Sequence, residues 1–95
     1  MGEMTTDERI GEAVDQLRRS NRSASMAHLV AYATAWIEYE DADVNIRENG
    51  TIVYHPKTGA PINNPYMGIR DGAERRMTKI RGINADVLWV RRSGA

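Results

Sequence analysis

The chain has 95 residues, a length that corresponds to one domain, and its 13 basic and 13 acidic residues give a formal net charge of +0. Overall charge therefore does not identify a nucleic-acid-binding protein, and the absence of cysteine excludes a disulfide framework or a thiolate metal site. No apolar run approaches the roughly 20 residues that a membrane-spanning helix needs. A chain this short buries roughly two-thirds or less of its unfolded surface, so self-association would stabilise it considerably.

The first predicted element is a helix over residues 7–19. Thr5, followed three residues later by Glu8, forms a capping box, which is typical of a helix start. Three arginines cluster at the end of this helix and in the break after it: Arg18, Arg19 and Arg22. Cations are favoured at a helix C-terminus because they face the negative end of the dipole, and a phosphate-contacting patch is the alternative interpretation.

A long helix is predicted over residues 24–49, with apolar residues on two faces. The main face carries Met26, Leu29, Val30, Ala33, Trp36, Ile37 and Val44. The second face, roughly opposite, carries His28, Tyr32, Ala35, Tyr39, Ala42 and Ile46. A helix with two apolar faces needs two packing partners. We expect the second face, through Tyr32, Tyr39 and Ile46, to pack against a neighbouring chain; two contacts within the chain are the alternative.

The C-terminal half of this helix is acidic. The segment 38–48 contains five acidic residues and one arginine, which indicates either a solvated face or a face that meets basic residues across an interface. Gly50 is expected to end the helix. A β-hairpin is then predicted over residues 51–62, with its turn at 55–59, and Pro61 restricts the second strand to an edge position. Such a hairpin is barely stable alone and should lie on the helices or on another subunit.

A further helix is predicted over residues 65–81, because Asn64 is a good N-cap residue and Pro65 suits the first helical position. Its apolar stripe consists of Tyr66, Ile69, Ala73, Met77 and Ile80. Asp71 and Glu74 lie on one flank of this stripe, and the basic residues Arg75 and Lys79 share the other flank with two glycines, Gly68 and Gly72. Each glycine costs about 1 kcal/mol relative to alanine in a helix, so we expect another backbone to approach there.

A last short helix is predicted over residues 85–92, with Asn84 as its N-cap and Trp89 available for packing. From Pro65 onward the chain carries seven basic and three acidic residues, so the balanced total conceals a basic C-terminal third. The predicted fold class is therefore mainly α: one small helical domain, residues 1–95, with a long central helix and one short β-hairpin.

No catalytic motif appears in the sequence. There is no Gly-rich phosphate loop, no metal-binding cluster and no paired carboxylate arrangement, and the two histidines, His28 and His55, are isolated. We therefore expect no enzymatic activity, no metal and no cofactor. The remaining features are typical of a protein that acts by contact with other molecules.

The order of the central elements resembles the small subunit of tailed-phage terminases. The resemblance is carried by an aromatic-rich helix with AYATAWIEYEDADVNI, a glycine and hairpin in ENGTIVYHPKTGAPINNP, and a helix that opens on Asn-Pro and continues as RDGAERRMTKIRGI. It covers residues 24–89. Such proteins form homo-oligomeric rings of about eight to ten subunits, bind double-stranded viral DNA to initiate packaging, and recruit and regulate the large ATPase–nuclease subunit in the cytoplasm of the bacterial host.

This resemblance gives the charged residues a role as candidate DNA contacts. They are Arg75, Arg76 and Lys79, then Arg18, Arg19 and Arg22, then Arg91 and Arg92. For each group the alternative is a solvated charge or a charge paired at an interface. Candidate residues for the oligomer interface are Tyr32, Tyr39, Ile46, Gly68 and Gly72.

A second class of function fits the same sequence features. A non-catalytic helical adaptor, or an antitoxin-like regulatory protein, could dimerise through the long helix. Oligomer number separates the two interpretations, because an adaptor predicts about two or four chains where a terminase ring predicts about eight to ten.

Overall fold

The computed structural model describes residues 2–94, with the backbone alone for Arg91, Ser93 and Gly94. Its elements in chain order are α1 (Thr6–Ser20), α2 (Met26–Asn49), β1 (Ile52–Tyr54), β2 (Pro61–Asn63), α3 (Tyr66–Lys79) and α4 (Asp86–Gly94). The described chain is mainly helical with one two-stranded antiparallel sheet, so the predicted fold class is confirmed.

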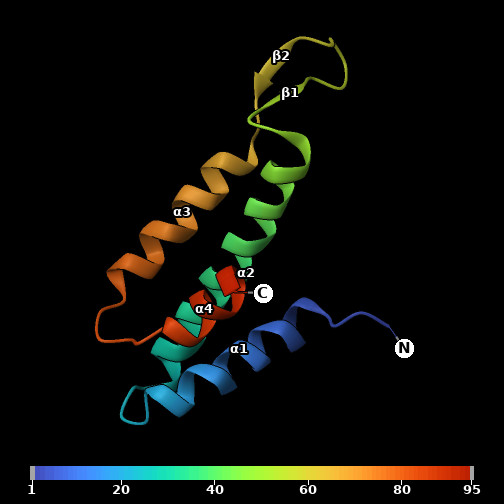
Figure 1. Ribbon diagram of the computed structural model, residues 1–95. Helices are drawn as coiled ribbons and strands as arrows, with labels where there is room; N and C mark the ends of the chain where they lie inside the picture. Colours follow the sequence, from blue (N-terminus) through green and yellow to red (C-terminus); the bar gives the residue numbers. More distant parts are fainter. Residues whose placement is uncertain (1, 95) are drawn as a thin grey trace.

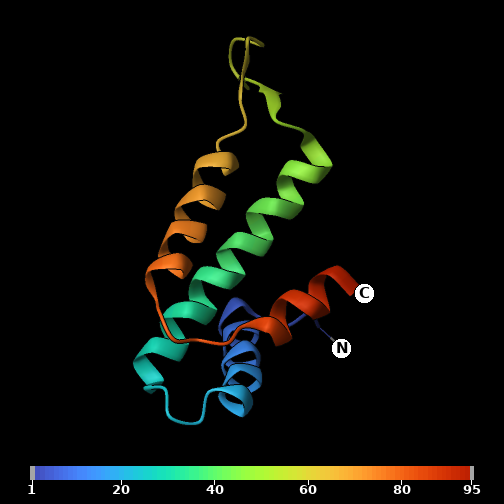
Figure 2. The same cartoon turned by 60° about the vertical axis from the view of Figure 1, so that its left-hand side comes forward.

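Helix α2 is the central element. Helix α3 runs back beside it, while α1 and α4 lie against the N-terminal and middle parts of α2 (Figure 1). The hairpin β1–β2 extends beyond the α2–α3 pair at the opposite end, as Figure 2 also shows. The molecule is accordingly elongated, with extents of 51 × 36 × 24 Å.

The helix ends follow from local sequence. Thr5 Oγ1 accepts a hydrogen bond from the Glu8 N–H at 3.1 Å, and the Glu8 carboxylate accepts one from the Thr5 N–H at 3.1 Å, so the capping box is present. Ser25 caps α2 by accepting a hydrogen bond from the His28 N–H at 3.1 Å. Gly50 follows the last residue of α2 with a φ of 87°, a left-handed conformation that favours glycine.

Helix α3 ends at Lys79, two residues before the predicted boundary at 81. The Ile80 N–H donates to the Met77 carbonyl at 3.2 Å, which tightens the final turn. The chain then turns through Gly82, whose φ is 79°. This early end places Arg81 in the loop between α3 and α4 instead of on the helix.

The apolar core lies between α2 and the helices around it. Its larger members are Val14, Leu17, Leu29, Tyr32, Trp36, Ile37, Met77 and Leu88. Trp36 is 3% exposed, and its ring centroid lies 4.7 Å from that of Trp89 in an edge-to-face arrangement. The Tyr39 ring contacts Trp89 in the same way at 5.3 Å. Because such aromatic pairs stabilise beyond their buried area, they hold α4 against α2.

The second apolar face of α2 packs within the chain. Tyr32 and Ile46 are each 7% exposed, and the Trp89 indole N–H donates a hydrogen bond to the Tyr32 hydroxyl at 3.3 Å. Tyr39 is half-buried beside Trp89. These three α2 residues are therefore not a free face for a neighbouring chain, and the alternative of two contacts within the chain describes the structure. The helical spacing of apolar residues predicted this second face correctly. It could not show that α4 returns across α2 and covers it.

Apolar burial is incomplete at the hairpin end. In α3, Ala73 and Met77 are buried, but Tyr66 is 39% and Ile69 45% exposed. On α2, Val44 is 46% exposed. Helices α1 and α4 do not reach this end (Figure 1), and two helices alone cannot enclose their own apolar faces. Among residues 2–94, no helix combines the length and apolar character needed to cross a membrane.

The hairpin is short and projects from the helices. Its register places Val53 opposite Ile62, and both are half-buried. Ile52 and Tyr54, which alternate onto the other face of β1, are 51% and 71% exposed. Of the two expected placements, on the helices or on another subunit, the first is therefore not observed: the hairpin does not lie on the helices of its own chain.

Asn64 joins the base of the hairpin to both long helices. It is 2% exposed, and its Oδ1 accepts a hydrogen bond from the N–H of Tyr66, the first residue of α3, at 2.9 Å; the N-cap position itself is held by Pro65 and not, as predicted, by Asn64. Its Nδ2 also donates to the Gly50 carbonyl at 2.9 Å and to Asn45 Oδ1 at 3.1 Å. One buried amide thus fixes the end of α2 relative to the start of α3.

Candidate nucleic-acid interface

The acidic segment of α2, residues 38–48, forms ion pairs with several arginines of the chain. Its carboxylates form ion pairs within the chain as follows: Arg9 with Glu40 and Asp41, Arg47 and Arg70 with Asp43, Arg76 with Glu38, and Arg92 with Glu40 and Asp43. These carboxylates are therefore engaged with arginines of α1, α2, α3 and α4. The two interpretations offered by the sequence, a solvated face and an intermolecular contact, did not include this arrangement.

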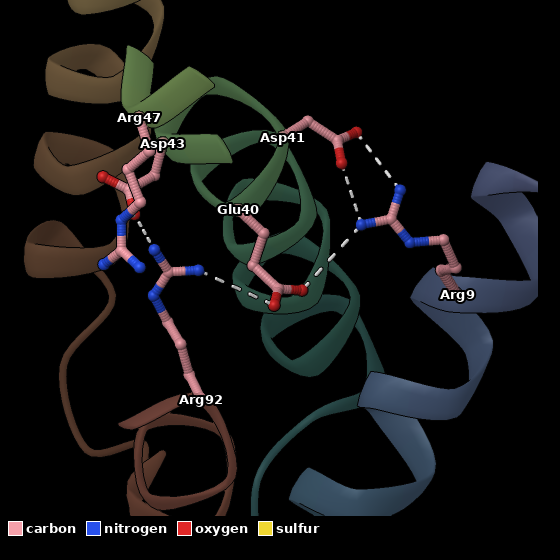
Figure 3. Close-up of polar contacts among 6 residues, drawn as sticks. All are labelled: Arg9, Glu40, Asp41, Asp43, Arg47 and Arg92. Atoms are coloured by element: carbon pink, nitrogen blue, oxygen red, sulfur yellow. Dashed lines mark hydrogen bonds and ion pairs between the residues drawn. The ribbon is translucent and has the colours of Figure 1, made fainter. Parts of the chain in front are cut away.

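Asp43 is the centre of this network. Its side chain is 8% exposed, and Oδ1 lies 3.0 Å from Arg70 Nη1 of α3. Its Oδ2 lies 3.0 Å from Arg47 Nε and contacts Arg92 of α4 (Figure 3). A buried carboxylate is tolerated only when it is paired and hydrogen-bonded, so these arginines are structural.

Arg9 forms the corresponding link between α1 and α2. Its Nη2 lies 2.9 Å from Asp41 Oδ1 and 3.9 Å from Glu40, on the other side of α2 from Arg47 (Figure 3). The hydrogen bond to Asp41 raises the pKa of Arg9; burial opposes this rise, and the charges of Asp41 and Glu40 raise the pKa further. Arg9 therefore stays protonated and paired.

Two of the predicted DNA contacts, Arg92 and Arg76, form ion pairs within the chain. Arg92 is not a free cation, because its side chain is 14% exposed, pairs with Asp43 and Glu40, and lies with its guanidinium carbon 5.5 Å from the centre of the Tyr39 ring. Arg76 pairs with Glu38 and donates to the Gly72 carbonyl at 3.4 Å. The side chain of Arg91 lies outside the described residues. The sequence pattern missed both pairings because the acidic partners are far away along the chain.

Four exposed arginines gather at the end of the molecule opposite the hairpin. They are Arg18 and Arg19 at the end of α1, Arg22 in the α1–α2 turn, and Arg81 in the α3–α4 loop; we call them the basic end. Arg19, Arg22 and Arg81 line one shallow groove, and Arg18, Arg19 and Arg22 line the groove beside it. Within residues 2–94 none of the four has a carboxylate partner. Arg81 was not among the DNA contacts predicted from the sequence.

Asn21 holds the two segments of the basic end together. It is 8% exposed, and its Nδ2 donates to the Leu17 carbonyl and to the Asn84 carbonyl, each at 2.8 Å. The Asn84 N–H donates in return to Asn21 Oδ1 at 2.7 Å. The α1–α2 turn and the α3–α4 loop are therefore joined by a reciprocal pair of hydrogen bonds through one buried side chain.

The predicted basic flank of α3 forms no ion pair with the described residues. Its cations, Arg75 and Lys79, are both exposed. The adjacent glycines lie in open space: a Cβ at Gly68 would meet nothing within 4 Å, and one at Gly72 would meet only the Arg75 guanidinium at 4.0 Å. No segment of the described chain approaches this flank closely, so the expected close approach does not occur within the subunit.

The two histidines have no catalytic surroundings among the described residues. His28 is exposed beside the basic end. His55 Nδ1 accepts a hydrogen bond from the Lys57 N–H at 3.1 Å, which stabilises the hairpin turn. Residues 2–94 contain no group of three or more potential metal ligands.

The fold and the charge distribution define a class: a small helical protein that presents a basic end and exposed apolar surface for contact with other molecules. The family model described as phage terminase, small subunit, matches residues 8–82. The chain belongs to this family. The match extends from α1 through α3 and stops before α4. Searches of curated proteins and of solved structures give no match.

Proposed function

We propose that this terminase small subunit assembles into a closed ring, binds double-stranded viral DNA to initiate genome packaging, and recruits and regulates the large ATPase–nuclease subunit. Membership of the family supports each part of this proposal. By the same analogy the ring has about eight to ten subunits, and the protein acts in the host cytoplasm without catalysis or a cofactor of its own.

The surface of the subunit supports assembly. Apolar side chains of the hairpin and of the nearby helix ends remain exposed, notably Ile52 and Tyr54. On α3, the exposed acids Asp71 and Glu74 lie on a different flank from the exposed cation Lys79. Pairing of an acidic flank with a basic flank of the next subunit is heterologous, and a heterologous contact generates a ring when its rotation closes.

The single observation that carries DNA binding is the cluster of four unpaired arginines at the basic end. Pairing within the chain removes Arg76 and Arg92 from the candidates, while the four arginines of the basic end stay exposed and unpaired among the described residues. Phosphate contacts from arginine and lysine supply most of the sequence-independent affinity for DNA. Among residues 2–94 no helix stands out as one that would enter the major groove, so contact with the DNA backbone is the favoured mode.

The test of DNA binding is a salt titration with a duplex of packaging-site or arbitrary sequence. We expect the logarithm of the binding constant to fall linearly with the logarithm of salt concentration. The triple variant Arg18→Gln, Arg19→Gln, Arg22→Gln should reduce that slope by about 1 for each lost phosphate contact. Arg76→Gln, which removes a cation already paired with Glu38, is the matched control and should have little effect. Equal slopes for the triple variant and the wild type would contradict this assignment.

Recruitment of the large subunit is tested by co-purification of the two proteins. Binding of the large subunit by the wild-type oligomer, with a change in its ATPase rate, is the expected result. A failure to bind in the presence of DNA would leave the adaptor as the better description of the protein.

A further inference from the structure

The basic end is built from two segments that are far apart along the chain. Arg22 lies in the turn after α1, and Arg81 lies in the loop after α3, yet both line the same groove with Arg19. Within residues 2–94 the side chain of Asn21 bridges the two segments, because it forms hydrogen bonds to both the N–H and the carbonyl of Asn84. The position of Arg81 relative to Arg22 therefore depends on Asn21.

We propose that the α1–α2 turn and the α3–α4 loop act as one phosphate-binding surface for the DNA backbone, with Arg81 as a contact residue and Asn21 as the positioning residue that couples the two loops. This inference rests on the proposed DNA binding and deepens it. It assigns Arg81 and Asn21, neither of which was a candidate from the sequence.

The chemistry of the grooves fits a phosphodiester backbone. Beside its arginines, the groove that contains Arg81 is lined by the hydroxyl residues Ser20, Ser23 and Ser25, and hydroxyl groups are common donors to phosphate oxygens. Asp15 is the one carboxylate among the lining residues of the two grooves. A surface of many donors and few acceptors suits an anionic chain that passes across both loops.

An acidic protein surface is the other partner that such cations could meet. Within a ring, the available acids of a second copy would include Asp71 and Glu74 on α3. The two cases differ in a measurable way, because loss of a subunit contact changes the native mass and loss of a DNA contact does not.

The test is a double-mutant cycle read out by the salt dependence of DNA binding, with native mass recorded for every variant. Arg81→Gln should reduce the slope by about 1 for each subunit that touches the DNA, without a change in native mass. In the Asn21→Ala background the same Arg81→Gln change should have no further effect, because the loop no longer holds position 81 at the DNA. Lys57→Gln, at the exposed hairpin turn, is the control for removal of a distant cation and should leave the slope unchanged.

Several results would overturn the inference. An unchanged slope in Arg81→Gln would remove Arg81 from the DNA surface, and an equal effect of Arg81→Gln in both backgrounds would remove the coupling role of Asn21. A smaller native mass in Arg81→Gln would assign the basic end to a subunit contact. If Asn21→Ala does not fold, Asn21→Ser replaces it in the cycle with the same expectation. Absence of DNA binding by the wild type would instead overturn the proposed function itself.

Discussion

Buried polar side chains at the ends of helices determine how the segments of this protein meet. Asn21 and Asn64 are 8% and 2% exposed, and each amide bonds to backbone groups of a different segment. Asp43 also joins separate segments, because its carboxylate forms ion pairs with arginines of α3 and α4. Satisfied buried polar groups specify one arrangement, since any slip of the segments leaves a group unpaired in a low-dielectric environment.

The capping box of α1 predicts a local dependence on pH. Two hydrogen bonds with Thr5 lower the pKa of Glu8. The larger effect comes from the Thr5 N–H and the smaller one from the Thr5 side chain. A carboxyl whose pKa is lower in the folded state stabilises that state above its unfolded pKa, near 4.3, and this contribution disappears as the pH falls through the folded value. NMR of the Glu8 carboxyl and of the first turn of α1 should show that turn fray in acid. In Glu8→Gln the fraying should lose its pH dependence; persistence of the same acid transition would assign it to another group.

Removal of the charge at Asp43 should destabilise the subunit strongly. Asp43→Asn leaves buried or half-buried arginines without their carboxylate, and breaking a buried pair costs about 3–5 kcal/mol. The matched control is Asp41→Asn, whose side chain is 53% exposed and whose pair with Arg9 should contribute about 0.2–1 kcal/mol. Denaturant unfolding at fixed protein concentration gives both free energies. Similar losses for the two variants would mean that the Asp43 network is not the link between α2, α3 and α4.

At the scale of elements, the sequence predicted what depends on neighbouring residues and missed what depends on distant ones. The capping box at Thr5, the end of α2 at Gly50 and the hairpin follow from local chemistry. The burial of Tyr32 does not, because it requires α4 to return across α2 and place Trp89 there. The same reason applies to the candidate site. The sequence shows that Arg92 carries a positive charge, but only the fold brings its partner Asp43 next to it.

Helix α3 offers a test of the assembly surface. An added side chain at Gly72 meets only the Arg75 guanidinium at 4.0 Å within the chain, so a polar residue there should be accommodated and should raise helix propensity by about 0.5–1 kcal/mol. If a neighbouring subunit packs on this flank, Gly72→Gln should reduce the native mass and leave the helical circular dichroism intact. Gly11→Gln, at an open helical position on α1, is the control and should change neither. An unchanged native mass in Gly72→Gln would exclude this flank from the assembly surface.

At the scale of the whole molecule, two different surfaces lie at opposite ends of an elongated subunit. The hairpin end carries exposed apolar side chains, with Tyr54 the most exposed at 71%, while the basic end carries Arg18, Arg19, Arg22 and Arg81 (Figure 1). In the ring that we propose, every subunit would have the same orientation about the axis, and the basic ends would lie at the same level around it. Together they would provide many phosphate contacts from subunits that are individually neutral in formal charge.

The measurement that tests this account most directly is the native mass of the purified protein at micromolar concentration, by native mass spectrometry or light scattering. The proposed function predicts a single closed species of about eight to ten chains, because a heterologous contact that closes gives one defined number of subunits. A monomer or a dimer would contradict the ring, and would favour a helical adaptor that acts without encircling or wrapping DNA.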